Sequence, residues 1–214
     1  MKITKFEHAC LEIEQGGKRI IVDPGMYTRP MDAKTDVAAI VITHQHDDHC
    51  WEEQLERIIA QNAGVPILAP ADACERLAAK GILATPVFHG DHYEFGGFTF
   101  DFFGDLHEVI HRSIPVIQNR GVLINNRLYY PGDSYTVPDV PVEVLAVPTS
   151  APWLRIAEVI DFVAAIKPKH AFATHNVHLS EQGHALNNGR VQQVVEAGGG
   201  EFRFLLPGES WSLD

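Results

Sequence analysis

Cysteine is scarce in this sequence. The 214 residues include three, Cys10, Cys50 and Cys74. An odd number without obvious pairing is not a disulfide framework and is typical of a reducing compartment, so we expect a cytoplasmic protein. Cys50 adjoins a histidine, but we interpret it as a small buried residue at the start of a helix.

Positive charge and long apolar runs are lacking as well. Lys and Arg number 17 against 28 Asp and Glu, which gives a formal net charge of −11. Nucleic-acid binding needs an excess of cations, so a small-molecule substrate is favoured and no nucleic acid is expected. No apolar stretch approaches membrane-spanning length, and the first residues lack the apolar core of a signal peptide. We therefore expect no membrane association.

The hydrophobic content of 45% and the length are typical of one α/β domain covering residues 1–214. Paired strands come first, and strands and helices then alternate. Strands are predicted at 2–6, 9–14, 18–22, 37–42, 65–69, 86–89, 93–103 (broken by Gly96-Gly97), 121–130 (turning at Asn125-Asn126), 142–147, 170–174, 201–206 and 210–213. Helices are predicted at 51–59, 71–80, 154–166 and 189–197.

The stretch Thr43-His44-Gln45-His46-Asp47-Asp48-His49 stands out. It follows the apolar, β-branched run 37–42, which has the character of a strand buried on both faces. His44 and His46 are two residues apart and project to the same side if strand geometry continues. If the chain then turns into a helix, Asp48 and His49 point toward a second position nearby, so the pattern predicts a dinuclear metal site.

Imidazole and carboxylate together suit zinc, manganese or iron(II), and no nearby cysteine pair suggests a closed structural zinc site. The plainer alternative is a surface loop that happens to be rich in histidine. Four ligand-type residues in six positions after a buried strand favour the metal site.

Further histidines and aspartates also follow predicted strands. They are His107 and His111 after 93–103, Asp133 in Pro131-Gly132-Asp133-Ser134, and His175 after 170–174. Asp23, which precedes a proline at the end of 18–22, is either a turn residue or a support for the histidine loop. For His8, a position near the mouth of the site and a purely structural role both remain open.

The H-x-H-x-D-H pattern at 44–49, together with Gly132-Asp133-Ser134 and His175, resembles the metallo-β-lactamase superfamily over nearly the whole chain. The resemblance implies a four-layer αββα sandwich. It also implies that His44, His46 and His107 or His111 hold one divalent ion, that Asp48, His49 and His175 hold a second, and that Asp133 bridges them. Asp23 would brace the histidine loop.

By this resemblance the protein is a metal-dependent hydrolase in which a hydroxide, bound by two ions about 3.5–4 Å apart and most simply zinc, cleaves a small ester, lactone or phosphodiester. Asp48 is expected to take part in catalysis as well as in binding metal. The opening around His8 is similar to the branch related to L-ascorbate 6-phosphate lactonase. The competing hypothesis is a catalytically silent metal-binding or regulatory module on the same fold.

Three finer points follow. We favour His107 as the ligand, with His111 beside the metals as a hydrogen-bond or proton donor to the substrate. Trp153 lies in a loop that either covers the site, meets a partner subunit in a homo-oligomer, or packs into the core. A phosphorylated substrate would need local cations, and the candidates are Arg112, Arg120 and Lys169. The alternative is that these three residues are solvated surface charges.

Overall fold

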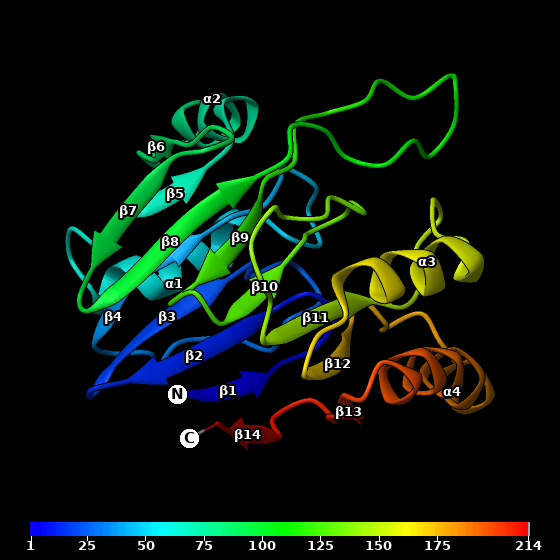
Figure 1. Ribbon diagram of the computed structural model, residues 1–214. Helices are drawn as coiled ribbons and strands as arrows, with labels where there is room; N and C mark the ends of the chain where they lie inside the picture. Colours follow the sequence, from blue (N-terminus) through cyan, green and yellow to red (C-terminus); the bar gives the residue numbers. More distant parts are fainter. Residues whose placement is uncertain (214) are drawn as a thin grey trace.

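The computed structural model describes residues 1–213, and two seven-stranded sheets face each other in it with helices on the outside (Figure 1). The first sheet has the order β14 (Ser210–Ser212), β1 (Lys2–Lys5), β2 (Leu11–Gln15), β3 (Lys18–Val22), β4 (Val37–Val41), β5 (Ile67–Ala69), β6 (Thr85–Pro86). The second has the order β13 (Glu201–Arg203), β12 (His170–Thr174), β11 (Val144–Pro148), β10 (Leu128–Tyr130), β9 (Gly121–Ile124), β8 (Phe98–Phe103), β7 (His92–Phe95).

Within residues 1–213, four helices cover the outer faces of the sheets. The first sheet is covered by α1 (Glu52–Gln61) and α2 (Ala71–Ala78), and the second by α3 (Ile156–Ile166) and α4 (Glu181–Ala197). Buried side chains form three apolar layers, because each sheet buries both faces. Ile13 of the first sheet and Phe100 of the second both lie in the layer between the sheets. Leu55 of α1 packs against the outer face of the first sheet, and Val159 of α3 against that of the second. The predicted αββα sandwich is confirmed.

The predicted tight turns are present. Asn125 and Asn126 have φ of 54° and 53°, and Gly16 and Gly17 have 59° and 77°. Two successive left-handed residues are typical of the two-residue hairpin turns that match the twist of the flanking strands. Asparagine and glycine tolerate this conformation best, which is why these turns could be predicted from the sequence.

Three predicted elements are wrong in extent. The strand predicted at 201–206 ends at residue 203, because β13 comprises Glu201–Arg203. The last helix begins at Glu181 and not at residue 189, and the Ser180 hydroxyl caps it by accepting a hydrogen bond from the Gly183 N–H (3.2 Å). Gly183 and Gly189, both poor helix formers, obscured its first turns in the sequence. The strand predicted at 86–89 is wrong beyond residue 86, because β6 comprises Thr85–Pro86 and pairs with β5.

The cysteines agree with the predicted lack of pairing, since all three thiols are free and Cys50 is buried as expected. Among the helices of residues 1–213, none combines the length and the apolar character that crossing a membrane requires.

Candidate metal centre

The residues predicted to bind metal converge where loops follow the strands. Three overlapping groups have their ligand atoms within 4.8 Å of one another. The groups are His44, His46 and His107; His44, His49 and Asp133; and His8, Asp48, His49 and His175. The last group includes His8, whose role the sequence left open. His8 follows β1, and its side chain reaches Asp48. His111 belongs to none of the groups found among the described residues.

Asp23 braces the histidine loop, as expected. Its carboxylate is fully buried and accepts hydrogen bonds from the Thr43 N–H (2.7 Å) and the Thr43 hydroxyl (2.6 Å). Its Oδ2 also lies 2.7 Å from His49 Nδ1. Gly25, two residues on, approaches the backbone so closely that a Cβ there would lie 1.7 Å from the Asp48 carbonyl oxygen. The segment after β3 is thus packed directly under the loop that carries the ligands.

Four histidines share one hydrogen-bonding arrangement, in which Nδ1 faces an oxygen. His49 Nδ1 faces Asp23, His107 Nδ1 faces the Glu108 carbonyl (2.5 Å), and His175 Nδ1 faces the Ser150 carbonyl (2.5 Å). His44 Nδ1 lies 3.1 Å from the Thr43 hydroxyl, whose own proton goes to Asp23. Each Nδ1 therefore carries a proton, which makes Nε2 the nitrogen that can present a lone pair to a metal ion at the centre, as in metal-ligating histidines.

Those Nε2 atoms have no hydrogen-bond partner in the described part of the chain. His44 Nε2, His49 Nε2, His107 Nε2, His175 Nε2 and Asp133 Oδ1 are all buried and unsatisfied. Leaving a buried polar atom unpaired costs about 1–3 kcal/mol, so five in one place call for a bound group that satisfies them. Four lone pairs and a carboxylate around one space fit divalent transition-metal ions.

Asp133 lies at the middle of this cluster. Its Oδ1 is 3.2 Å from His49 Nε2, and its Oδ2 is 3.1 Å from His175 Nε2 and 3.4 Å from His107 Nε2. Burial alone would raise the pKa of this carboxyl, but the imidazoles of His175 and His49 hold it well below the usual range. Asp133 is thus an anion that contacts ligands of both predicted ions.

Trp153 covers this cluster and does not face outward. Its indole is 7% exposed and donates a hydrogen bond from Nε1 to Asp133 Oδ2 (2.9 Å). The ring packs edge-on against His107, with centroids 5.9 Å apart. The structure therefore confirms that Trp153 covers the site, which was one of the three interpretations of its loop. The indole N–H was not predictable from the sequence as a partner of Asp133.

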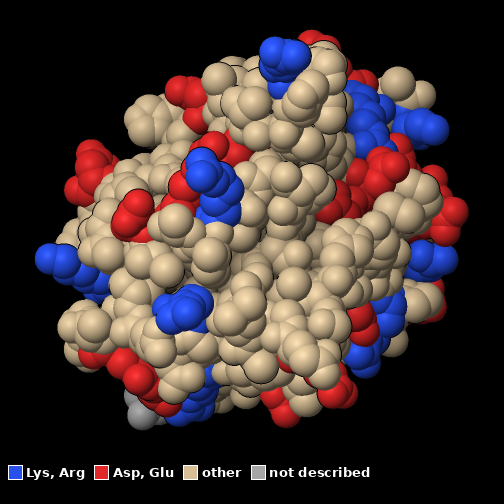
Figure 2. Space-filling model, turned by 90° about the vertical axis from the view of Figure 1, so that its right-hand side faces the viewer, with Lys and Arg blue, Asp and Glu red and all other residues tan. Residues whose placement is uncertain are grey.

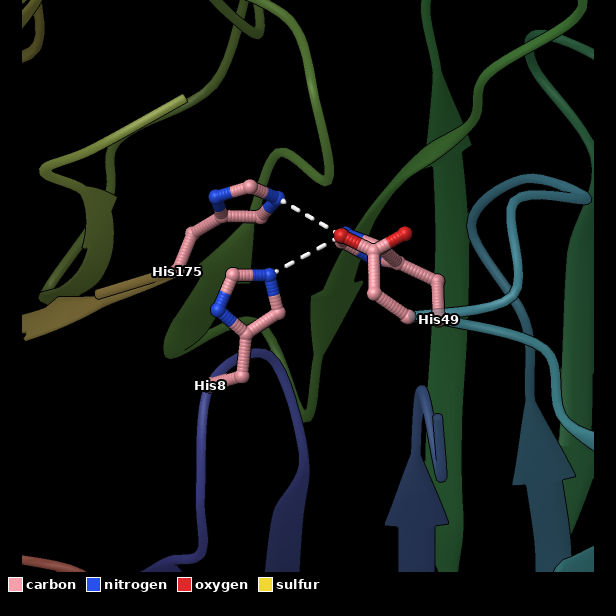
Figure 3. A group of neighbouring side chains, drawn as sticks. His8, His49 and His175 are labelled. Carbon is pink, nitrogen blue, oxygen red and sulfur yellow. Dashed lines mark hydrogen bonds and ion pairs between the residues drawn. The ribbon is translucent and has the colours of Figure 1, made fainter. Parts of the chain in front are cut away.

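His8 is buried beside Asp48, with Nε2 2.9 Å from Asp48 Oδ2. His175 Nε2 lies 3.4 Å from the same oxygen, and Figure 3 shows His8 and His175 pointing to one place beside His49. The Val177 N–H approaches His8 Nδ1 (3.4 Å). An N–H can only donate, so Nδ1 is the acceptor and the proton is on Nε2. His8 therefore has the opposite tautomer to the four histidines above and donates to Asp48.

Strained backbone supports the same corner. His8, Asp23 and His175 have φ of 56°, 46° and 53°, a conformation that costs non-glycine residues about 1–3 kcal/mol each. The His8 carbonyl accepts the His175 N–H (2.9 Å), so the two unusual residues are joined by their backbones. No sequence signal predicts the left-handed backbone conformation of these three residues.

His107 and His111 occupy different environments. His107 is 4% exposed, and its ring lies 4.9 Å from that of His44 and 4.8 Å from that of His46. His111 is exposed, and its Nδ1 lies 2.7 Å from the Ser113 hydroxyl. The structure thus brings His107 to the cluster and leaves His111 on the surface of the loop between β8 and β9. The proton-donor role of His111 stays a prediction.

A pocket of about 250 Å³ opens over the cluster. Besides the candidate ligands it is lined by Met26, Tyr27, Asp47, Ile110, Pro152, Trp153 and His178. No Lys or Arg of the described residues lines it. His8 follows β1 and His107 follows β8, at strand ends that point to the right in Figure 1; Figure 2 looks onto that side and shows mainly uncharged side chains in its middle.

The cations considered for substrate binding do not line this pocket. Arg120 is buried and bound to the Asp105 carbonyl (2.7 Å), and Lys169 precedes β12, at the opposite end of that strand from His175. Arg112 is exposed on the loop between β8 and β9. Arg76 touches the lining residue Asp47 (2.6 Å) from outside the pocket.

Comparison with known proteins decides the family. Residues 2–175 match the family described as the beta-lactamase superfamily domain. The chain belongs to the metallo-β-lactamase superfamily. The predicted family is thus confirmed.

Relatives of this superfamily member match over almost its whole length. A Mycobacterium tuberculosis protein, "Protein Rv0786c", is 33% identical over 215 residues, covering 98% of each chain. A "UPF0173 metal-dependent hydrolase" of Carboxydothermus hydrogenoformans is 27% identical over 229 residues, again covering 98% of each. Among solved structures, Igni18 of Ignicoccus hospitalis, described as a novel metallo hydrolase, superposes with a TM-score of 0.75 at 19% identity and covers 100% of this chain and 99% of its own. This last likeness concerns the fold.

Proposed function

We propose that this superfamily member is a metal-dependent hydrolase with a dinuclear centre that acts on a small, uncharged ester or lactone. The observation that supports it best is the set of five buried, unpaired ligand atoms around one space. The name of the Carboxydothermus relative, a metal-dependent hydrolase, agrees with the activity.

The proposed ligands divide between two ions. One would be held by His44, His46 and His107, the other by Asp48, His49 and His175, with Asp133 between them. Zinc fits this donor set, and manganese and iron(II) also suit imidazole and carboxylate. When bound, such a pair supplies a nucleophile at neutral pH by lowering the pKa of water, and it stabilises the negative charge that develops on the substrate.

The chain's own residues hold and shield this chemistry. Asp23 and the carbonyls of Glu108 and Ser150 fix the orientation of the imidazoles. The indole N–H of Trp153 fixes one oxygen of Asp133, and its ring restricts the access of water. At the rim, the Tyr27 hydroxyl and His178 Nε2 lie 3.2 Å apart, where either can hydrogen-bond a polar substituent of a substrate.

The lining of the pocket favours an uncharged substrate. Binding a phosphate in a partly enclosed site calls for Arg or Lys donors, and the lining contains the carboxylate of Asp47 in their place. Met26, Ile110, Pro152 and Trp153 add apolar surface. Of the three predicted substrate classes, ester and lactone therefore fit better than phosphodiester, and better than the phosphorylated lactone suggested by the branch resemblance.

A comparison of hydrolysis rates tests the function. Protein loaded with zinc or manganese is offered p-nitrophenyl acetate, a γ-lactone and bis-p-nitrophenyl phosphate, with Asp133→Asn as the inactive variant and His89→Ala, an exposed histidine, as the control. We expect hydrolysis of the ester or lactone that chelation abolishes and that Asp133→Asn lacks. Hydrolysis of the phosphodiester alone contradicts the substrate class. Protein that holds two ions and cleaves none of a wider panel of esters and lactones favours the silent module.

A further inference from the structure

A second cavity, of about 600 Å³, lies between α4 and the segment after β13. Its walls are mostly apolar, and several of the apolar side chains remain exposed: Val177 by 42%, Phe204 by 41% and Leu206 by 52%. Cavities of this size with apolar walls and a few polar groups are typical of small-molecule sites. His8 lines the cavity as well and separates it from Asp48 of the metal centre.

A buried cation lies in the wall of this cavity. Lys5 is 1% exposed, and within residues 1–213 its ammonium has a single hydrogen-bond acceptor, the Phe6 carbonyl (2.9 Å). Burial lowers the pKa of Lys5 to about 8, while Glu7 opposes the shift. The Glu7 carboxylate is itself held by Arg29 (2.6 Å). An ammonium has three donors, so Lys5 lacks acceptors that an anion would supply.

Two more polar atoms beside the cavity are unsatisfied. Asn188 is 7% exposed, and its Oδ1 has no hydrogen-bond partner among the described residues; the same holds for His184 Nδ1. Both residues line the cavity from α4. Lys5 lies close enough to His184 to lower its pKa, after the larger effect of burial. A polar atom that the protein leaves unpaired marks a place where a bound molecule can supply the missing hydrogen bond; His184 Nδ1 can donate to an anion in one tautomer, whereas Asn188 Oδ1 can only accept.

We propose that this cavity binds an amphipathic monocarboxylate, with its carboxylate on Lys5 and its aliphatic chain along Val177, Phe204 and Leu206. A single cation suits one negative charge. A dianion such as phosphate is disfavoured because Glu7 and Glu181 also line the cavity. This site is separate from the proposed hydrolytic pocket and needs no turnover there.

Calorimetric titration of the metal-loaded protein with sodium hexanoate, sodium octanoate and 1-octanol tests the site. We expect one carboxylate per chain, an affinity that rises about fourfold per methylene, and octanoate bound at least about tenfold more tightly than octanol. Lys5→Met, which keeps an unbranched side chain one atom shorter and removes the charge, should weaken the binding of octanoate by about tenfold or more and leave that of octanol unchanged. Lys80→Met, at an exposed position after α2, is the matched control.

Ala185→Trp provides a second variant, because Ala185 lines the cavity from an exposed position of α4 and a large ring there fills it. It should abolish binding of both octanoate and octanol while the metal content stays that of the wild type. Octanoate binding that is unchanged in Lys5→Met overturns the proposal and places the carboxylate elsewhere, the metal centre included. Absence of carboxylate binding together with a dimer that Ala185→Trp dissociates also overturns it, because the cavity is then a subunit interface.

Discussion

Replacing His8 should weaken one metal position selectively. His8 donates from Nε2 to Asp48 Oδ2 (2.9 Å), and Val177 N–H fixes the tautomer that does so. A hydrogen bond to a charged group contributes about 1.5–3 kcal/mol, and removing a partner that orients a ligand typically costs 10–100-fold in metal affinity. We expect His8→Ala to lower the affinity for the ion at Asp48, His49 and His175 by about 10–100-fold.

The ion at His44, His46 and His107 should keep its affinity, because His8 contacts none of these three residues. Competition with a chromophoric chelator, followed by elemental analysis, measures both positions. Under conditions that leave wild-type protein with two zinc ions, His8→Ala should hold one. His178→Ala is the control, since its ring centroid lies 5.5 Å from that of His8 but its hydrogen bond goes to Tyr27.

His8→Gln separates a hydrogen-bond donor from a ligand. The Gln side-chain amide reaches about as far as the imidazole Nε2 and can donate to Asp48, so it should restore most of the lost affinity. If His8→Gln binds this ion as weakly as His8→Ala does, the proposed donor role of His8 is refuted, because His8 then acts as a metal ligand. It is also refuted if both ions weaken equally or neither does. Thermal unfolding of each variant checks that the fold is intact.

Further predictions concern the other residues of the site. His107→Ala should lower metal occupancy, whereas His111→Ala should leave both ions bound and slow turnover. Elemental analysis measures the metal content of both variants, and rate measurements compare their turnover. Loss of metal in His111→Ala alone would reverse our assignment of the ligand. Asp133→Asn should weaken the binding of both ions in the same chelator competition, because Asp133 contacts His49 and His175 of one proposed ion and His107 of the other. Burial opposes but Asp133 and Asp48 raise the pKa of His175 to about 9. Nearby carboxylates also raise the pKa of His49 against the opposing effect of burial. Metal must displace these protons, so zinc affinity should rise with pH below pH 9, by about tenfold per pH unit for each proton displaced, and a pH-independent affinity would contradict this.

The histidine-rich loop of the candidate metal centre and the layered fold were predictable because each leaves a local pattern, whereas the roles of His107, Asp133 and His175 came from the family resemblance. Run 37–42 is buried on both faces and ends one residue before Thr43, so His44, His46 and Asp48 had to emerge together at a sheet edge. The hairpin at Asn125-Asn126 follows from turn chemistry alone. These patterns depend on residues that are close in the sequence, so tertiary contacts do not alter them.

Bracing by Asp23 was expected, but two other supporting contacts were not predictable, because they join distant segments. The indole of Trp153 reaches Asp133 across 20 residues, and His8 reaches Asp48 across 40. Whether a tryptophan in a loop covers a site or meets a partner depends on packing that no local pattern encodes. The start of α4 was missed for a different reason, since the Ser180 cap and the packing of α4 in the core together offset the unfavourable propensity of Gly183 and Gly189. Homo-oligomer formation stays a prediction for size-exclusion chromatography with light scattering.

The central claim is a dinuclear hydrolytic centre, and a metal titration tests it most directly. Protein freed of metal by chelation is titrated with zinc while hydrolysis of a neutral ester or lactone is followed at each addition. The arrangement of His44, His46, His107, Asp48, His49, His175 and Asp133 predicts activity that rises and saturates at two equivalents per chain. Saturation at one equivalent, or two ions bound without any hydrolysis across the panel of neutral substrates, would contradict it.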